Sequence, residues 1–201
     1  MRSEARATLA LATLALASAQ GRARAAQAPA GFTPVKGAVV IPVDSTVHAV
    51  NGRLSLTSVA TASAAGRTQK TQRAEFYDGI FQIRQARALR PFTDIAVRSE
   101  NFKQVCGAKA KGASAIGARS RRVSRLWGNG RGRFRTVGRN SAATVRGTIW
   151  LTEERCEGTL TRVTRGVVSV RDLRAKRTVV VRAGRSYLAR AIRATVKARK
   201  R

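Results

Sequence analysis

The sequence predicts an all-β protein in which antiparallel hairpins form a sandwich or a β-roll. Three dipeptides support this prediction, because runs of alternating apolar residues flank Asn51-Gly52, Asp78-Gly79 and Asn129-Gly130. Both positions of such a pair tolerate the positive φ that two-residue hairpin turns require. The second half adds strand candidates about ten residues apart, a spacing typical of sandwiches, barrels and β-rolls. They cover residues 142–146, 148–152, 159–163, 167–171, 178–182 and 186–188.

Residues 1–25 are predicted to be a cleavable signal peptide. Arg2 and Arg6 precede an uncharged stretch over 7–19 that is rich in Ala and Leu, and cleavage sites of the small-x-small kind end at Ala19 and Ala25. The alternative is an uncleaved amphipathic or membrane helix, but this short stretch falls well below the roughly 20 residues that span a bilayer. We therefore expect an extracytoplasmic protein, whether secreted, periplasmic or associated with the cell envelope, without a permanent transmembrane span.

The rest of the chain divides by composition into a lead-in, two β-units and a tail. A flexible lead-in of small residues and proline occupies 26–34. The N-terminal β-unit is expected over 35–105 and the second β-unit over 123–190. Between them lies an Ala-, Gly-, Ser- and Lys-rich loop at 106–122, for which a short helix is the alternative. The basic residues 191–201 form either a marginal amphipathic helix or a frayed tail.

Two segments of the first half recur in the second. Residues 50–57 and 145–152 share the pattern V-x-G-x-aliphatic-x-L-T, and residues 78–84 align with residues 165–171 further along. A degenerate duplication of one β-unit explains this similarity. Chance similarity among strands punctuated by glycine is the alternative.

Cys106 and Cys156 are the two cysteines of the chain. In an exported protein such a pair most simply forms a disulfide. Closing a loop of about 50 residues contributes roughly 4 kcal/mol in the chain-entropy model, and a pair of buried free thiols is the alternative. Because the chain has a single histidine, His48, and no carboxylates clustered near it, we predict neither a metal site nor a cofactor.

Catalytic chemistry finds little support in the sequence, so we expect no enzyme and no catalytic residue. His48 lies in a strand beside an Asn-Gly pair, where an outward-facing hairpin residue is the simpler interpretation. Glu153, Glu154 and Glu157 cluster in an expected turn, where solvation and pairing with arginine are simpler than acid–base catalysis. The Gly-rich residues 128–132 have strand-like flanks on both sides, which favours a β-turn over a phosphate-binding loop.

The chain carries 40 Lys or Arg residues against 10 Asp or Glu, a formal net charge of +30. The codon usage of a GC-rich genome explains part of this excess, yet such a field attracts polyanions. The predicted contacts are basic residues near the carboxyl end: Arg190, Arg193, Lys197, Arg199, Lys200 and Arg201. Four aromatic residues are candidate stacking platforms for bases or sugars, with burial in the core as the more usual alternative: Trp127, Phe134, Trp150 and Tyr187.

Four motifs of the second half fit the pattern of one known family. They are a Val-Arg-Gly-Thr strand within 143–150, a Gly-Thr pair within 156–159, a Gly-Val-Val-x-Val strand within 164–170 and an Ala-Gly-x-x-Tyr segment within 181–187. Together they resemble the FecR-like domain, over about residues 120–190 and more weakly over 38–100. The resemblance implies an extracytoplasmic β-rich domain, used in ferric-citrate-type signalling to relay receptor occupancy to an anti-sigma system.

The chain departs from the signalling plan of that family. It shows no anti-sigma segment before the hydrophobic stretch at 7–19. We therefore expect a stand-alone, non-enzymatic module that binds or scaffolds an envelope protein or polymer, with a sensing or regulatory role. The alternative is a secreted polyanion-binding protein that takes nucleic acid, an anionic envelope polymer or an anionic lipid.

Overall fold

The computed structural model describes residues 10–14, 29–62, 68–107 and 121–191. Within these ranges strands dominate beside one short helix, α1 (Phe102–Cys106), so the all-β prediction is confirmed. The strands are β1 (Ala10–Leu14), β2 (Ala38–Ile41), β3 (Thr46–Thr61), β4 (Lys70–Gln85), β5 (Thr93–Arg98), β6 (Arg122–Gly130), β7 (Phe134–Val137), β8 (Ser141–Arg155), β9 (Gly158–Asp172), β10 (Arg177–Arg182) and β11 (Ser186–Arg190).

Five strands close into a barrel, which corrects the predicted sandwich or β-roll. Around the ring β4 pairs with β5, β5 with β7, β7 with β8, β8 with β6, and β6 with β4. The β5–β7 pair is parallel and the other four are antiparallel. The ring closes because β4 changes neighbour along one edge, pairing with β6 over 74–77 and with β5 over 80–85. The barrel therefore takes strands from both predicted β-units.

The three predicted hairpin turns are wrong, because each dipeptide lies within a strand. Asn51-Gly52 falls at a register shift in β3, Asp78-Gly79 lies in the middle of β4, and Asn129-Gly130 ends β6. Asp78 does adopt a positive φ of 63°, as a turn residue would. Residues that tolerate positive φ serve bulges as well as turns. Asn51-Gly52 and Asp78-Gly79 thus mark places where the chain departs from regular strand geometry without reversing it, whereas Asn129-Gly130 keeps a regular register to the end of β6.

In the second half, glycine residues also lie where two predicted strands prove to be one continuous strand. β8 unites the two candidates within 142–152, and β9 unites the two within 159–171. Gly147 and Gly166 mark the junctions, with φ angles of 63° and 82°. A Cβ on Gly166 would lie 2.6 Å from the carbonyl oxygen of Gly147, so the strands can touch here only without that side chain.

The two longest hairpins, β3–β4 and β8–β9, contain the repeated segments. The first copies lie in β3 and β4, and the second copies lie in β8 and β9. In both hairpins the pairing register shifts beside the repeated glycine, which is Gly52 in β3 and Gly147 in β8. This equivalence favours duplication over chance similarity.

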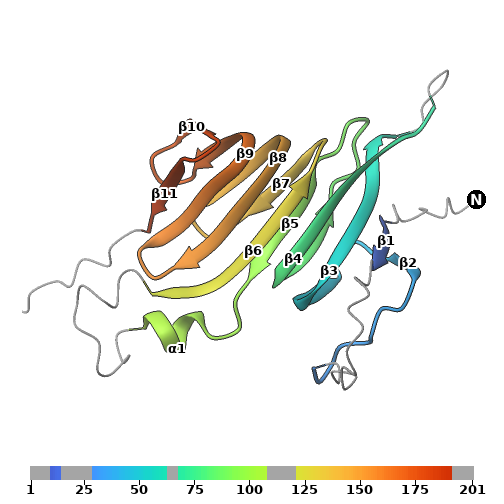
Figure 1. Ribbon diagram of the computed structural model, residues 1–201, viewed down its shortest axis with the longest axis horizontal. Coiled ribbons are helices and arrows are strands. Elements are labelled where there is room, and N and C mark those ends of the chain that lie inside the picture. The colour runs from blue at the N-terminus through green and yellow to red at the C-terminus, as the bar shows by residue number, and fades with distance from the viewer. Residues whose placement is uncertain (1–9, 15–28, 63–67, 108–120, 192–201) are drawn as a thin grey trace, which may run out of the picture.

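Further strands extend the sheet on both sides of the barrel (Figure 1). On one side β3 pairs with β4, and β1 lies between β3 and β2, antiparallel to both. On the other side β9 pairs with β8 and carries both β10 and β11. Because β1 falls within the predicted signal peptide, cleavage after Ala19 or Ala25 would remove one strand from the sheet.

Aromatic side chains form the centre of the core. Phe76 is fully buried, and its ring centroid lies 5.5 Å from that of Phe81, 5.8 Å from that of Phe134 and 6.1 Å from that of Trp150. The Trp150 indole N–H donates to Thr136 Oγ1 at 3.2 Å, which satisfies the polar atom of a buried side chain. Phe134 and Trp150 are thus core residues and not stacking platforms.

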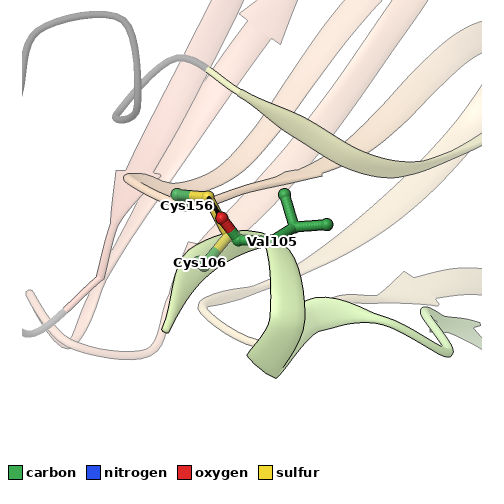
Figure 2. The surroundings of a disulfide bond; sticks show 3 residues. All are labelled: Val105, Cys106 and Cys156. Atoms are coloured by element: carbon green, nitrogen blue, oxygen red, sulfur yellow. Dashed lines mark hydrogen bonds between the residues drawn. A yellow bond between two sulfur atoms is a disulfide. The ribbon is translucent and has the colours of Figure 1, made fainter. Parts of the chain in front are cut away.

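A disulfide joins α1 to the turn between β8 and β9, which confirms the predicted Cys106–Cys156 pair (Figure 2). The two Cα atoms are 5.2 Å apart. The Val105 carbonyl oxygen lies 3.9 Å from Cys156 Sγ, a packing contact because a bridged sulfur carries no proton. The Arg139 guanidinium lies 3.9 Å from the centroid of the Phe102 ring and adds a second link between α1 and the barrel. The expected loop that follows lies largely outside the described residues.

Candidate anion-binding groove

An open groove of about 820 Å³ lies where the ends of β3 and β6 meet the start of β4 and the junctions of β8 and β9. Basic and glycine residues supply much of its lining. Five of its fifteen lining residues are Lys or Arg and one is Glu: Lys70, Arg73, Arg131, Arg133, Arg165 and Glu75. We call this feature the basic groove.

Glycine lets the segment after β6 lie directly against β4. A Cβ on Gly130 would overlap Ala74, and a Cβ on Gly132 would lie 2.6 Å from Gln72 Oε1. Gly132 also has a φ of 116°, which side-chain-bearing residues rarely adopt. This close approach brings Arg131 and the residues beside it to the groove.

A buried hydrogen-bond network fixes the backbone of Arg133. Gln72 Oε1 accepts from the Arg133 N–H at 2.5 Å, and Gln72 Nε2 donates to Ser58 Oγ at 3.2 Å and to Thr93 Oγ1 at 3.1 Å. The Arg133 carbonyl in turn accepts from the Thr93 N–H at 2.9 Å. Because both backbone groups of Arg133 are held by buried partners, the side chain starts from a fixed position.

The Arg133 guanidinium lies over an aromatic ring and keeps unused donors. Its central carbon is 4.1 Å from the centroid of the Phe92 ring, a favourable cation–π geometry. Its Nε is buried and has no hydrogen-bond partner among the described residues. Because this Nε is shielded from solvent, a ligand would meet the other atoms of the Arg133 side chain, which lines the groove.

The positive charge of the groove is largely uncompensated. Among the described residues, no carboxylate forms an ion pair with any of its five basic side chains. Its single acid, Glu75, instead pairs with Arg53 at 2.9 Å. The Arg131 side chain lies over the β8 junction, because its Cγ is 3.7 Å from the position that a Cβ on Gly147 would take. Cations that share a concave surface without counter-charges produce a strongly positive local potential.

An aromatic pair continues the outer surface of β4 and β6 beside the groove. Tyr77 and Trp127 are register partners, with ring centroids 6.2 Å apart and planes within 6° of parallel. The Arg53 guanidinium lies 4.0 Å from the centroid of the Tyr77 ring. Both rings are only partly buried. Trp127, like Tyr187, is therefore a predicted platform residue that remains partly exposed, and it lies beside a tyrosine that the sequence did not single out.

The predicted polyanion contacts lie elsewhere. Arg190 is exposed at the end of β11 and pairs in register with Gly158. Arg165 lies seven residues further along β9, and seven strand residues span about 23 Å. Arg190 thus stands well away from the basic groove. The other five predicted contacts, Arg193, Lys197, Arg199, Lys200 and Arg201, lie outside the described residues.

The other candidate side chains pack against, or form polar contacts with, neighbouring residues of the fold. His48 packs edge-on against Phe32 at 5.4 Å between ring centroids. Glu153 and Glu154 lie within β8 and not in the expected turn. Glu153 pairs with Arg155 at 2.6 Å, whereas Glu154 is buried beside Thr159. Tyr187 donates its hydroxyl to Asp172 at 2.8 Å.

Sequence reasoning missed the basic groove because its residues are dispersed along the chain. The groove joins lysine and arginine from segments nearly a hundred residues apart, and arginine occurs throughout this sequence. One signal was available: the Gly-rich residues 128–132 contain Arg131 and precede Arg133. The β-turn expected there is wrong, because residues 128–130 belong to strand β6 and residues 132–133 form a bend before β7.

Comparison with known proteins identifies no relative. No family model, curated protein or solved structure matches this chain. Within the described ranges, no helix combines the length and the apolar character that crossing a membrane requires, and no three metal-ligating side chains come together. The resemblance to the FecR-like domain stays a prediction.

Proposed function

We propose that this protein is a non-enzymatic, extracytoplasmic binding protein that holds a polyanion in the basic groove. The observation that carries the proposal is the convergence of five basic side chains, none of which forms an ion pair with a described carboxylate. A soluble protein gains little stability from such an arrangement, because like charges repel. An anionic ligand supplies the missing partner.

The chemistry of arginine suits phosphate, sulfate and carboxylate groups. A guanidinium presents a planar fork of donors that matches two oxygens at once, and it loses little hydration on pairing. The fixed backbone of Arg133 and the ring of Phe92 hold one such fork in place. A repeating anion that spans several of these groups releases counter-ions at each contact, which favours polymers over small anions.

The disulfide supports an extracytoplasmic location, because such bonds persist in oxidising compartments. The predicted signal peptide and the FecR-like resemblance favour the same compartment. Within the proposal, the partner is an anionic polymer met outside the cytoplasm. Scaffolding or sensing at the cell envelope is the role that the FecR-like resemblance suggests for such binding.

The test measures binding of a short, fluorescein-labelled abasic phosphodiester strand by anisotropy over a range of salt concentrations. The double variant Arg131→Ser/Arg165→Ser should bind more weakly than wild type. The slope of log K against log salt should fall by about 0.7 for each lost contact with a single strand. Its matched control is Arg182→Ser/Arg185→Ser, which removes two exposed arginines at the β10–β11 turn.

The proposal requires the two double variants to differ. If the control loses as much affinity as the groove variant, binding follows net charge and no site exists. If wild type fails to bind the abasic strand even at low salt, the groove holds no polyphosphate backbone. Either result overturns the proposed function.

A further inference from the structure

We infer that the polyanion is a single strand of nucleic acid, whose phosphates follow the basic groove while a base stacks at the Tyr77–Trp127 pair. This inference rests on the proposed function and deepens it by naming the ligand class. The surroundings of the groove include a feature that a polymer without bases would not use. That feature is a pair of parallel, partly exposed aromatic rings.

The aromatic pair and the groove belong to one continuous surface. Arg73, Glu75 and Tyr77 alternate along β4, so their side chains project from the same face of the strand. On β6, Trp127 and Asn129 stand in the same relation, and Asn129 and Glu75 are register partners that both line the groove. Two strand residues span about 7 Å, which is close to the spacing between neighbouring phosphates of an extended strand.

Arg53 extends the aromatic row with a positive charge. Its guanidinium lies over Tyr77 while its Nη1 contacts Glu75 at 2.9 Å. The carboxylate at the groove edge is thereby neutralised and the arginine is held against the ring. Stacked aromatic and arginine groups beside a basic track are the recurrent means by which proteins hold single strands without reading sequence.

The same surface disfavours the other polyanions. In a duplex the bases are already stacked on each other, so the aromatic pair would find no free base face. Phosphate polymers without bases and anionic lipids would contact the cations alone. Of the other large aromatic rings near the groove, Phe76, Phe134 and Trp150 are fully buried. Phe92 is partly exposed, but the guanidinium groups of Arg133 and Arg135 lie 4.1 and 5.2 Å from its centroid.

The deciding experiment compares two labelled strands of equal length, one of oligothymidine and one abasic, on the full chain. Stacking of one base typically gains about tenfold or more in affinity. Wild type should therefore bind oligothymidine about tenfold more tightly than the abasic strand. Trp127→Leu should abolish that preference without changing affinity for the abasic strand. Trp127→Phe should retain part of it, because a ring remains.

Tryptophan fluorescence gives an independent readout. The chain has two tryptophans, and Trp150 is fully buried in the core. Oligothymidine should quench emission from Trp127, the abasic strand should not, and the quench should vanish in Trp127→Phe. The matched control is Phe32→Leu, because Phe32 is a partly buried aromatic residue that packs on His48 away from the groove. This variant should leave both affinities unchanged.

The outcomes separate this inference from the proposed function. If both strands bind equally tightly and Trp127→Leu changes neither, the stacking inference fails while polyanion binding stands. Tighter binding of a DNA duplex than of oligothymidine overturns the inference in the same way. If neither strand binds, or if Arg131→Ser/Arg165→Ser behaves like its control, the proposed function fails and the inference fails with it.

Discussion

Gly128 on β6 lies directly opposite Trp150 on β8, and the indole ring occupies the space that a side chain on Gly128 would need. The ring belongs to the aromatic centre of the core and is fully buried. The barrel therefore closes between β6 and β8 around a tryptophan that requires a glycine as its neighbour.

This relationship predicts that Gly128→Ala destabilises the protein by about 1–3 kcal/mol, the usual effect of overpacking a core. The ring would have to shift against Phe76, and no flexible side chain can absorb the overlap. Gly52→Ala is the matched control, because a Cβ at Gly52 would meet nothing within 4 Å. Thermal denaturation of both variants checks the prediction, and equal melting temperatures would contradict it.

Glu154 makes the stability of the barrel depend on pH. Its side chain is 1% exposed, its Oε1 accepts from Thr159 at 2.9 Å and from the Arg139 N–H at 3.1 Å, and its Oε2 has no partner among the described residues. Burial raises the pKa of Glu154 above its ordinary 4.5, against the opposing effect of these hydrogen bonds. A raised folded-state pKa means that stability falls as the pH rises from about 4.5 through the folded value.

Glu154→Gln should remove this dependence and leave the protein more stable than wild type at neutral pH, because the amide stays uncharged. Denaturant unfolding between acidic and neutral pH measures the effect. Glu100→Gln, at an exposed position, should follow the wild-type profile. Parallel profiles for wild type and Glu154→Gln would show that Glu154 does not titrate in this range.

Asp172 acts in the opposite direction. Burial works to raise its pKa, but donation from the Ala175 N–H, the Tyr187 hydroxyl and the Arg174 N–H, together with the charge of Arg177, lowers it below 3.8. Its contribution is present above the unfolded value and is lost as the pH falls through the folded value.

Asp172→Asn should therefore cost about 1–3 kcal/mol at neutral pH, since hydrogen bonds to a charged acceptor weaken. The deficit relative to wild type should shrink as the pH falls below about 4. Urea titrations at neutral and acidic pH test both statements. A deficit that stays constant down to acidic pH would assign it to lost packing and not to charge.

The disulfide should contribute strongly to stability, because it closes a loop of about 50 residues and ties α1 to the β8–β9 turn. Cys106→Ser/Cys156→Ser should lose about 2–5 kcal/mol relative to the oxidised protein. Reduction of wild type by a thiol should lower its melting temperature to that of the double variant. A double variant as stable as oxidised wild type would show that α1 and the barrel hold together without the bond.

The strand content and the disulfide could be predicted because they depend on local signals. Alternating apolar residues mark strands whatever their partners, and two cysteines in a chain that is predicted to be exported have one simple pairing. The course of the strands could not be predicted in the same way. Positive φ at Asp78 or Gly147 suits both a reversal and a bulge. Only the long-range pairing of β4 with β6, and of β8 with β6, decides between them.

The basic groove illustrates a second limit. Arg131, Arg133 and Arg165 look like many other arginines of the chain, and nothing in their spacing groups them. Their grouping depends on Gly132 lying against Gln72 and on the meeting of the β8 and β9 junctions. Trp127 and Trp150 likewise lie on strands of similar composition, and the closure of the barrel decides which ring becomes core.

Barrel closure also determines how late in synthesis the core of the protein can form. The first long hairpin contributes Phe76 and Phe81, but Phe134 and Trp150 arrive some fifty to seventy-five residues later. The parallel β5–β7 pair cannot form until the chain has passed α1 and β6. A nascent chain therefore exposes its aromatic hairpin for much of its elongation. Such an intermediate is prone to aggregation. A chaperone that shields this hairpin should therefore raise the yield of folded protein.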